Sequence, residues 1–361
     1  MPAGLLEVDG SIDIKQFWPD GRSDADTTKV VLNVGPNAIK FRKDSSSPFH
    51  PTHVFEGARV KGRTNKPPIN NGKITIRLQG IDATELHYQP SPLSTAEKKG
   101  RPAAQLKAYH DLVHSYRQLL GATSTKELHD FLGSTGKTTL DCRVITQVDT
   151  PNEVFDTCGR LVGDIEVTVN GKLLNLNHWL VEHGWAYPTF YSSMTSDEIN
   201  ALLALAKTAR SNKTLVWKFL SKTVGPFDFN LREPPVGNTS VLATDKGLAI
   251  FPKLFRRYTN FSPRKKAKIT AQNFQAFLVA GSGGKPDICF ETADFVANGV
   301  HSATPHNFAD FVVGGKTIKF QPDGLWFSRR LLPRCSGRTT NPSAVSKSRL
   351  SARFGDPASQ V

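Results

Sequence analysis

Five short runs of alternating or β-branched residues constrain the fold of the first half of this chain more than any other feature. The first two runs are separated by a turn signal, Pro-Asp-Gly at residues 19–21. A period of two, with many valine, isoleucine and threonine residues, is typical of β-strands. We therefore expect strands at residues 11–17, 28–34, 73–78, 138–148 and 161–169.

A helical period follows Pro102, where apolar residues recur at spacings of three and four: Leu106, Tyr109, Leu112, Val113, Tyr116, Leu119 and Leu120. This pattern predicts an amphipathic helix that covers the sheet. Two more helices are expected at residues 174–183 and 196–213. Five short strands with these helices favour an α+β fold, an OB-type five-stranded β-barrel with three helices.

The charge of the chain points to polyanionic partners. Its 361 residues include 46 Lys and Arg against 32 Asp and Glu, which gives a formal net charge of +14. Such an excess attracts nucleic acid, although a ribosome-associated or membrane-surface factor would share it. The four cysteines contain no C-x2-C pair, which argues against a structural zinc site.

The N-terminal residues contain neither a basic region nor an apolar run of the kind found in signal peptides. Nowhere do roughly 18 uncharged apolar residues follow one another, so we expect no membrane-spanning segment. The compartment stays open, because a cytoplasmic protein and one exported without a cleaved signal would look alike here. We expect a monomer.

Three polar segments far apart in the chain carry the chemistry. They read Ser-Asp-Ala-Asp-Thr at residues 23–27, Arg-Leu-Gln-Gly-Ile-Asp-Ala-Thr-Glu at 77–85 and Asp-Thr-Cys-Gly-Arg at 156–160. Each one alone is commonplace, because an isolated D-x-D is most often a turn with solvated carboxylates. Together they supply acidic oxygens for a hard cation, a carboxylate that can activate water, and guanidinium groups for a phosphate. This combination indicates metal-assisted phosphodiester cleavage.

With Asn-His-Trp-Leu-Val-Glu-His-Gly-Trp-Ala at residues 177–186, the three segments stand in an order that resembles staphylococcal-nuclease-like (thermonuclease) proteins. The resemblance covers roughly residues 11–220. It implies a calcium-dependent nuclease that hydrolyses DNA and RNA. It also implies that Asp26, Asp82 and the backbone carbonyl of Ala83 bind one calcium ion.

The resemblance further implies that Glu85 is the general base and that Arg77 and Arg160 bind the phosphate. The chemistry agrees, because calcium prefers oxygen ligands and a guanidinium group can bond two phosphate oxygens at once. No residue of the site is expected to read base edges, so base specificity should be low.

Aromatic residues after the expected helix at 174–183 are candidate nucleotide contacts. Tyr187, Phe190 and Tyr191, together with Trp185, lie where such nucleases place nucleotide-contacting tyrosines. Stacked aromatic rings would favour single-stranded or locally unpaired nucleic acid. Core packing is the equally good alternative for all four. One departure is Cys158, which stands where relatives often carry tyrosine.

The expected domain organisation has four parts: a nuclease domain at residues 1–222 with an insertion at about 35–72, a Pro- and Gly-rich linker at 223–237, a smaller β-rich domain at 238–328 and a disordered basic tail at 329–361. In the third part, residues 273–279 echo residues 307–313, which hints at paired β-rich halves. Its basic stretch, which includes Phe-Arg-Arg-Tyr at 255–258, either binds nucleic acid or is a solvated face.

A second class of function stays open, a non-catalytic OB-fold protein that binds nucleic acid. Such a protein would have no use for Glu85 beside a metal site. The presence of this glutamate together with both aspartates and both arginines therefore favours the enzyme.

Overall fold

A closed five-stranded barrel forms the centre of the computed structural model, which describes residues 4–53, 55, 68–156, 158–191, 194–224, 231–281, 286–298 and 302–327. Its strands are β1 (Leu5–Asp13), β2 (Thr27–Leu32), β6 (Lys73–Leu78), β8 (Thr139–Gln147) and β9 (Leu161–Val169). β1 pairs with β2 and β8, β2 pairs with β6, and β9 pairs with β6 and β8. Only the contact between β6 and β9 is parallel. The predicted OB-type α+β fold is therefore confirmed.

The barrel interior follows from the period of two in its strands. Alternate residues such as Leu6 and Val8 of β1, and Ile74 and Ile76 of β6, are fully buried in one core. β1 pairs with β8 along its whole length, and Gly10 lies where β1 pairs with β2, at which a Cβ would collide with the carbonyl oxygen of Val31. Glycine thus permits the tight curvature that closing so small a barrel requires.

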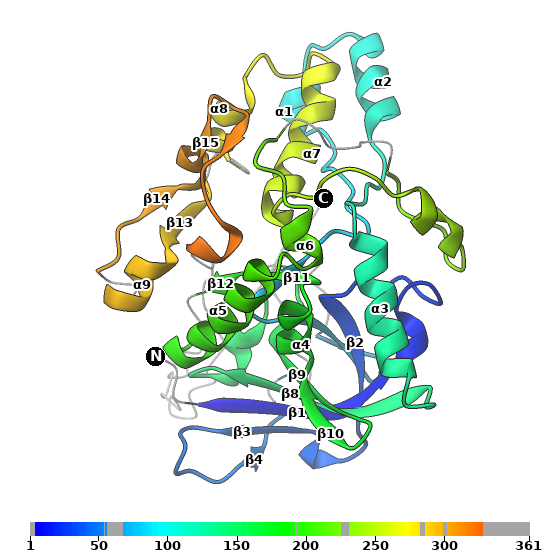
Figure 1. Ribbon diagram of the computed structural model, residues 1–361, viewed down its shortest axis with the longest axis vertical. Coiled ribbons are helices and arrows are strands. Elements are labelled where there is room, and N and C mark those ends of the chain that lie inside the picture. The colour runs from blue at the N-terminus through cyan, green and yellow to red at the C-terminus, as the bar shows by residue number, and fades with distance from the viewer. Residues whose placement is uncertain are drawn as a thin grey trace, which may run out of the picture.

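Three longer helices accompany the barrel: α3 (Gly121–Gly133), α4 (Leu176–Glu182) and α5 (Ser196–Ser211). Asn175 caps α4 through its side chain, and Thr195 begins α5 with a capping box. These two helices confirm the predictions at residues 174–183 and 196–213. Figure 1 shows them above the barrel strands, with α3 along one side.

The helix predicted after Pro102 is partly wrong. α2 (Ala103–Leu112) ends early, because residues 113–120 are not helical and Tyr116 exchanges two backbone hydrogen bonds with Tyr88. α2 packs against Ile269 and Leu93 in a small separate cluster, not on the sheet. The barrel is covered instead by α3, whose Leu128 and Leu132 belong to the main core.

The strand predictions differ from the structure mainly at their ends. Residues 73–78 and 161–169 are strands with these bounds, and the run at 11–17 is the end of β1 followed by the 3-10 helix η1 (Ile14–Gln16). Part of the predicted insertion extends the sheet, since β3 (Ile39–Arg42) pairs with β1. Residues 54 and 56–67 of that insertion lie outside the described residues. Shorter elements of the first half are η2 (Pro36–Ala38), β4 (His50–Pro51), β5 (Ile69–Asn70), β7 (Ile81–Ala83), α1 (Thr95–Lys98), η3 (Pro151–Val154), β10 (Lys172–Asn175), β11 (Ala186–Pro188), β12 (Phe190–Tyr191) and α6 (Leu215–Lys218).

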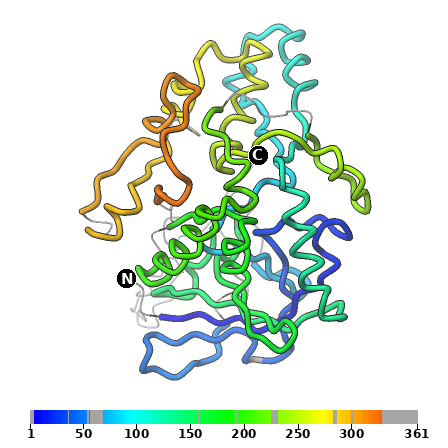
Figure 2. The backbone as a smooth tube through the Cα atoms, viewed as in Figure 1, coloured from blue at the N-terminus to red at the C-terminus, as the bar shows by residue number. Residues whose placement is uncertain are grey.

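The described residues after the barrel contain helices as well as small sheets, and Figure 2 shows them lying over one end of the barrel. β12 of the first half pairs with β17 (Leu325–Phe327), so both halves share one sheet. The other elements here are η4 (Thr239–Thr244), α7 (Pro252–Lys266), α8 (Phe274–Ala280), β13 (Ile288–Glu291), α9 (Thr292–Asn298), β14 (His306–Asn307), η5 (Phe308–Phe311), β15 (Val312–Val313), β16 (Thr317–Ile318) and η6 (Pro322–Gly324). The domain boundary at 223–237 stays a prediction, and the tail at 329–361 lies outside the described residues.

The predicted pairing of two β-rich halves is wrong. Residues 274–280 form the helix α8, whereas residues 307–313 form a 3-10 helix with flanking short strands. The two similar segments have in common that each begins with an N-capping asparagine, since the side chains of Asn273 and Asn307 each accept a backbone hydrogen bond. No helix in the described part of the chain combines the length and apolar character that a bilayer crossing requires.

Candidate active site

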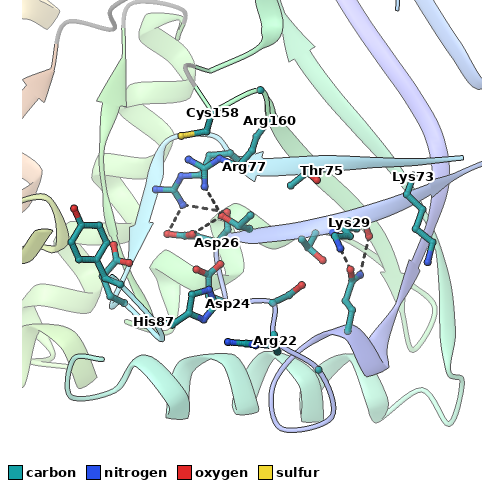
Figure 3. A pocket seen from close by; sticks show the side chains of 18 of the residues that line it. Arg22, Asp24, Asp26, Lys29, Lys73, Thr75, Arg77, His87, Cys158 and Arg160 are labelled. Atoms are coloured by element: carbon teal, nitrogen blue, oxygen red, sulfur yellow. Dashed lines mark hydrogen bonds and ion pairs between the residues drawn. The ribbon is translucent and has the colours of Figure 1, made fainter. Parts of the chain in front are cut away.

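The register of the barrel brings two of the three polar segments together. Thr27 at the start of β2 lies opposite Arg77 near the end of β6, so Asp26 comes next to this arginine. Gly80, at φ +73°, then turns the chain into β7, which carries Asp82. Figure 3 shows the side chains of Asp24, Asp26, Arg77 and Arg160 in one corner of a cleft.

Arg77 bridges the two aspartates that were predicted to bind calcium. Its Nη1 pairs with the carboxylate of Asp26, and its Nη2 lies 2.8 Å from Oδ1 of Asp82. The same nitrogens donate to the carbonyl oxygens of Asp26 at 3.2 Å and Ile81 at 3.0 Å. Asp82 is 0% exposed, so the arginine neutralises a carboxylate that has no access to water. Arg77, predicted to bind phosphate, is thus engaged by the metal-ligand candidates themselves.

Asp26 is held in its ionised form. Its Oδ2 accepts the backbone N–H of Ala83 at 2.9 Å, and its Oδ1 accepts the hydroxyl of Thr27 at 3.1 Å. Burial alone would raise the pKa of Asp26, but Arg77 and the Ala83 N–H outweigh burial, and the pKa lies below its ordinary value. Ala83, which follows Asp82 in the chain, therefore contributes its backbone N–H to the site.

Glu85 follows β7 in a loop and lines the cleft. Burial raises the pKa of Glu85 to about 7, opposed by Arg256 and reinforced by Asp82 and Asp26. A carboxyl group with a pKa near neutrality is well matched to accepting a proton at physiological pH.

Asp24 is a third carboxylate of the site, which sequence reasoning placed in the motif but gave no role. Burial and the neighbouring charge of Asp26 raise the pKa of Asp24 to about 7. Its Oδ1 is buried and receives no hydrogen bond from any described residue.

Arg160 reaches the site from the turn between η3 and β9. Asp156 organises this turn, because its Oδ1 accepts the N–H groups of Cys158 and Arg160, each at 2.9 Å. Its Oδ2 pairs with Nε and Nη2 of Arg160 at 2.8 and 2.7 Å. The remaining Nη1 donates to the hydroxyl of Thr27 at 3.0 Å, which places the guanidinium group beside Asp26. The third predicted segment therefore meets the other two.

The cleft has a volume of about 1270 Å³ and is lined mainly by polar and cationic side chains. Lys29 of β2 and Lys73 of β6 lie farther along the barrel strands from the carboxylates (Figure 3). His87 and Tyr88 line it from the loop after Glu85. A cleft of this size accommodates a nucleotide-sized ligand.

The carboxylates fit a hard cation by their chemistry. Calcium takes about 6–8 oxygen ligands, so protein oxygens, water and a phosphate would have to share it. Asp26 and Asp82 each accept three donor contacts of the roughly four that a carboxylate can take. Among the described residues, however, no three His, Cys, Asp or Glu side chains converge in a ready-made metal site. Guanidinium groups stand between the carboxylates instead.

The aromatic candidates are core residues where the structure describes their side chains. Tyr187 and Phe190 are 0% exposed, and the Tyr187 hydroxyl donates to the carbonyl oxygen of Val216 at 2.9 Å. Neither ring has a face open to a base, so core packing, the alternative stated above, holds for these two. Tyr191 belongs to the short strand β12, which pairs with β17.

Sequence reasoning missed one residue that contacts the site directly. Arg256 of α7 pairs with both Asp82 and Glu85. The basic, aromatic stretch at residues 255–258 was a signal that this helix faces something anionic, but nothing in the sequence connected it with Glu85.

Comparison with known proteins adds one finding. Residues 75–219 match the family model described as staphylococcal nuclease homologue. No curated protein matches the chain. The family match supports a nucleic-acid-related function of the nuclease kind. The matched part of the chain carries Arg77, Asp82, Glu85 and Arg160, so the predicted resemblance to staphylococcal-nuclease-like proteins is confirmed over residues 75–219.

Proposed function

We propose that this protein is a calcium-dependent phosphodiesterase that hydrolyses DNA and RNA with low base specificity. The observation that supports this proposal most is the meeting of Asp26, Glu85 and Arg160 at one cleft, although they come from three distant segments. Asp82 is buried beside them and is joined to Asp26 through Arg77. A carboxylate cluster beside guanidinium groups has the composition that phosphodiester hydrolysis requires.

Asp26 and Asp82 would hold the calcium ion, and Asp24 is a further carboxylate beside Asp26. When bound, the ion polarises a phosphate oxygen and neutralises its charge. Glu85 accepts the proton of the attacking water, because burial has brought its pKa close to neutrality. Positioned general-base catalysis of this kind contributes about 10²–10⁴-fold to a rate.

Arg160 binds the phosphate. Of its five N–H donors, Asp156 takes one on Nε and one on Nη2, and Thr27 takes one on Nη1. One donor on each terminal nitrogen makes no hydrogen bond with a described residue, and the planar group can present both donors together to the equatorial oxygens of the phosphate. Arg77 pairs with Asp26 and Asp82. To contact a phosphate, its guanidinium group would have to give up one of these two ion pairs.

Substrate preference follows from the lining of the cleft. Lys29, Lys73 and Arg160 attract the sugar-phosphate backbone, which is common to all sequences. With Tyr187 and Phe190 in the core, His87 and Tyr88 are the rings left to stack on an unpaired base.

The proposal is tested with supercoiled plasmid and single-stranded DNA, in calcium and then in chelator. The variants are Glu85→Gln and Arg160→Ala, with Arg143→Ala as the matched control. Arg143 lies on the barrel but outside the cleft, and it also pairs with carboxylates, those of Glu166 at 2.7 Å and Glu7 at 3.8 Å.

We expect wild type and the control to cut both substrates only with calcium, and the two site variants to lose cutting. Calcium-dependent cutting that survives both substitutions would contradict the residue assignment. Binding without cutting under every condition would instead favour the non-catalytic nucleic-acid-binding protein.

A further inference from the structure

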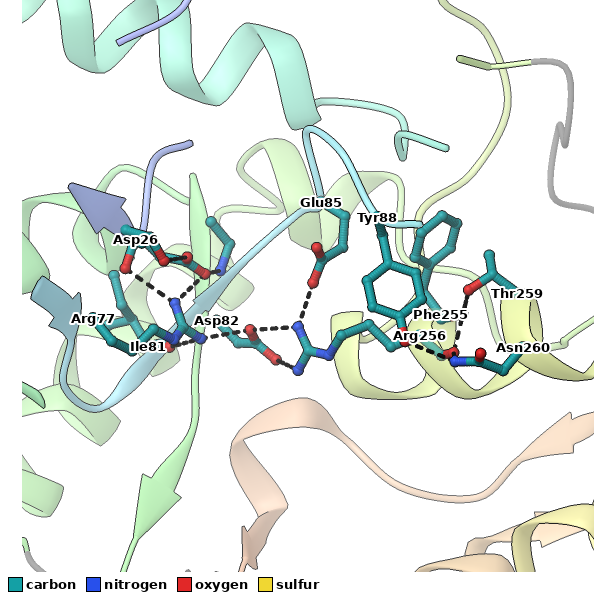
Figure 4. A network of polar contacts seen from close by, with 12 residues as sticks. Asp26, Arg77, Ile81, Asp82, Glu85, Tyr88, Phe255, Arg256, Thr259 and Asn260 are labelled. Atoms are coloured by element: carbon teal, nitrogen blue, oxygen red, sulfur yellow. Dashed lines mark hydrogen bonds and ion pairs between the residues drawn. The ribbon is translucent and has the colours of Figure 1, made fainter. Parts of the chain in front are cut away.

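One face of α7 lies against the loop that carries Glu85. Arg256, Asn260 and Arg264 are spaced by four residues, so they form a stripe on this helix. Figure 4 shows Arg256 and Asn260 extending from α7 toward the loop, with Tyr88 beside Asn260. This helix lies outside residues 75–219, which match the nuclease family.

Two side chains of α7 fix the helix along this loop. The side chain of Asn260 donates to the Tyr88 hydroxyl at 2.7 Å and accepts the backbone N–H of Ser91 at 2.7 Å. Arg264 pairs with Glu97 at 2.7 Å and is itself buried. The position of Arg256 relative to Glu85 is therefore supported by polar contacts one and two turns farther along the same helix.

Arg256 holds two carboxylates of the candidate site at once. Its Nη2 lies 2.8 Å and its Nη1 3.2 Å from the two oxygens of Asp82, and Nη1 also pairs with Oε1 of Glu85. Charge-assisted, two-pronged contacts of this kind are the strongest and the most directional that an arginine makes. Arg77 approaches Asp82 from the opposite side (Figure 4).

These contacts do not use every acceptor position of the two carboxylates. Asp82 accepts three hydrogen bonds from the two arginines, one fewer than the roughly four a carboxylate can take. Oε2 of Glu85 accepts no hydrogen bond from any described residue. An oxygen of Glu85 thus stays open to water while Arg256 restrains the other.

We propose that Arg256 is a positioning residue for Glu85 and Asp82, so that the C-terminal helix α7 completes the reaction site of the nuclease domain. This inference rests on the function proposed above. A glutamate side chain has several rotatable bonds, and a misplacement of about 1 Å in a catalytic group can cost about 10²-fold in rate. Arg256 removes that freedom by joining Glu85 to the buried Asp82.

The test is a double-mutant cycle with Arg256→Gln, Glu85→Gln and the two combined. Single-turnover cleavage of single-stranded DNA is measured in calcium, and the unfolding temperature is measured in chelator at pH 8. Arg210→Gln is the matched control, because Arg210 of α5 also pairs with a buried carboxylate of the C-terminal half, Asp323 at 2.6 Å, but outside the cleft.

We expect Arg256→Gln to lower the single-turnover rate about 10²-fold, and the combined variant to stay within about threefold of Glu85→Gln alone, because coupled residues are not additive. In chelator, Arg256→Gln should lower the unfolding temperature, and adding Glu85→Gln should lower it no further, since the glutamate no longer carries an unpaired charge. The control should leave the rate unchanged.

Multiplicative losses of rate, or additive losses of unfolding temperature, would overturn the positioning role. A wild type that does not cut, or a Glu85→Gln variant as fast as wild type, would refute the proposed function instead. The unfolding cycle would still decide whether Arg256 and Glu85 are coupled.

Discussion

Replacing Arg77 by glutamine should destabilise the protein strongly, and by an amount that depends on pH. The guanidinium group ion-pairs with Asp26 and with the fully buried Asp82. Breaking a buried ion pair by removing one partner costs about 3–5 kcal/mol. Arg256 still pairs with Asp82, and Ala83 still donates to Asp26, so we expect the lower end, about 3 kcal/mol at pH 8.

The pH dependence follows from Asp26. In wild type its pKa lies below the ordinary value, so the stabilisation it brings is complete at pH 5 and above and is lost only when the pH falls through that lowered pKa. Without Arg77, the largest effect that lowers the pKa of Asp26 is gone, so burial should raise this pKa above its ordinary value. The folded variant then binds a proton that the unfolded chain has released, so the stability of the variant falls as pH rises through this window.

Urea unfolding in chelator at pH 5 and pH 8 measures both effects. The loss of unfolding free energy should be larger at pH 8 than at pH 5. The matched control is Arg143→Gln, which removes a half-exposed arginine from its pairs with Glu166 and Glu7 and should cost less than about 1 kcal/mol. A loss for Arg77→Gln as small as that of the control would show that the two buried ion pairs do not stabilise the fold, and an equal loss at both pH values would show that Arg77 does not set the pKa of Asp26.

Three further predictions concern activity and binding. Because burial raises the pKa of Glu85 to about 7, kcat/KM should rise with pH toward 7 and level off above it, and a flat profile from pH 5 to 8 would contradict the assignment of the base. Arg160→Ala should lower kcat by about 10²–10³-fold, as expected for loss of a charge-stabilising donor. In urea unfolding the same variant should lose less than about 1 kcal/mol of unfolding free energy, because the side chain is partly exposed. A large loss of stability would mean that the arginine is structural. Lys29→Gln and Lys73→Gln should each reduce the salt dependence of single-stranded DNA binding by about one unit of slope, measured by fluorescence anisotropy, and unchanged slopes would exclude these lysines from the strand path.

The barrel was predictable because local signals and tertiary structure agree there. The runs at residues 73–78 and 161–169 alternate with a clear period of two, and the structure makes both of them strands. The end of the helix after Pro102 was not predictable. Its apolar spacing continues through Tyr116, but the backbone at Tyr116 pairs with Tyr88 and is not helical. A long-range pairing of this kind leaves no trace in a local period.

The candidate site was partly predictable for a similar reason. Asp26 and Arg77 stand at strand ends, and strand register brings such residues together without further information. Arg256 was out of reach, since its contact with Glu85 spans 171 residues and depends on how α7 docks. Tyr187 was named as a candidate nucleotide contact and is instead a core residue. An aromatic residue after a helix fits a base-stacking surface and a core equally well, and only its burial in the structure distinguishes the two.

In the proposed reaction, Glu85 activates water against a phosphate beside the carboxylates of Asp26 and Asp82. The most direct measurement is the single-turnover cleavage rate of single-stranded DNA at saturating calcium, for wild type and Glu85→Gln, with the Kd of each for the same DNA. We predict a rate about 10²–10⁴-fold lower in the variant with an unchanged Kd. Equal rates, or a loss that disappears at saturating DNA, would contradict the account.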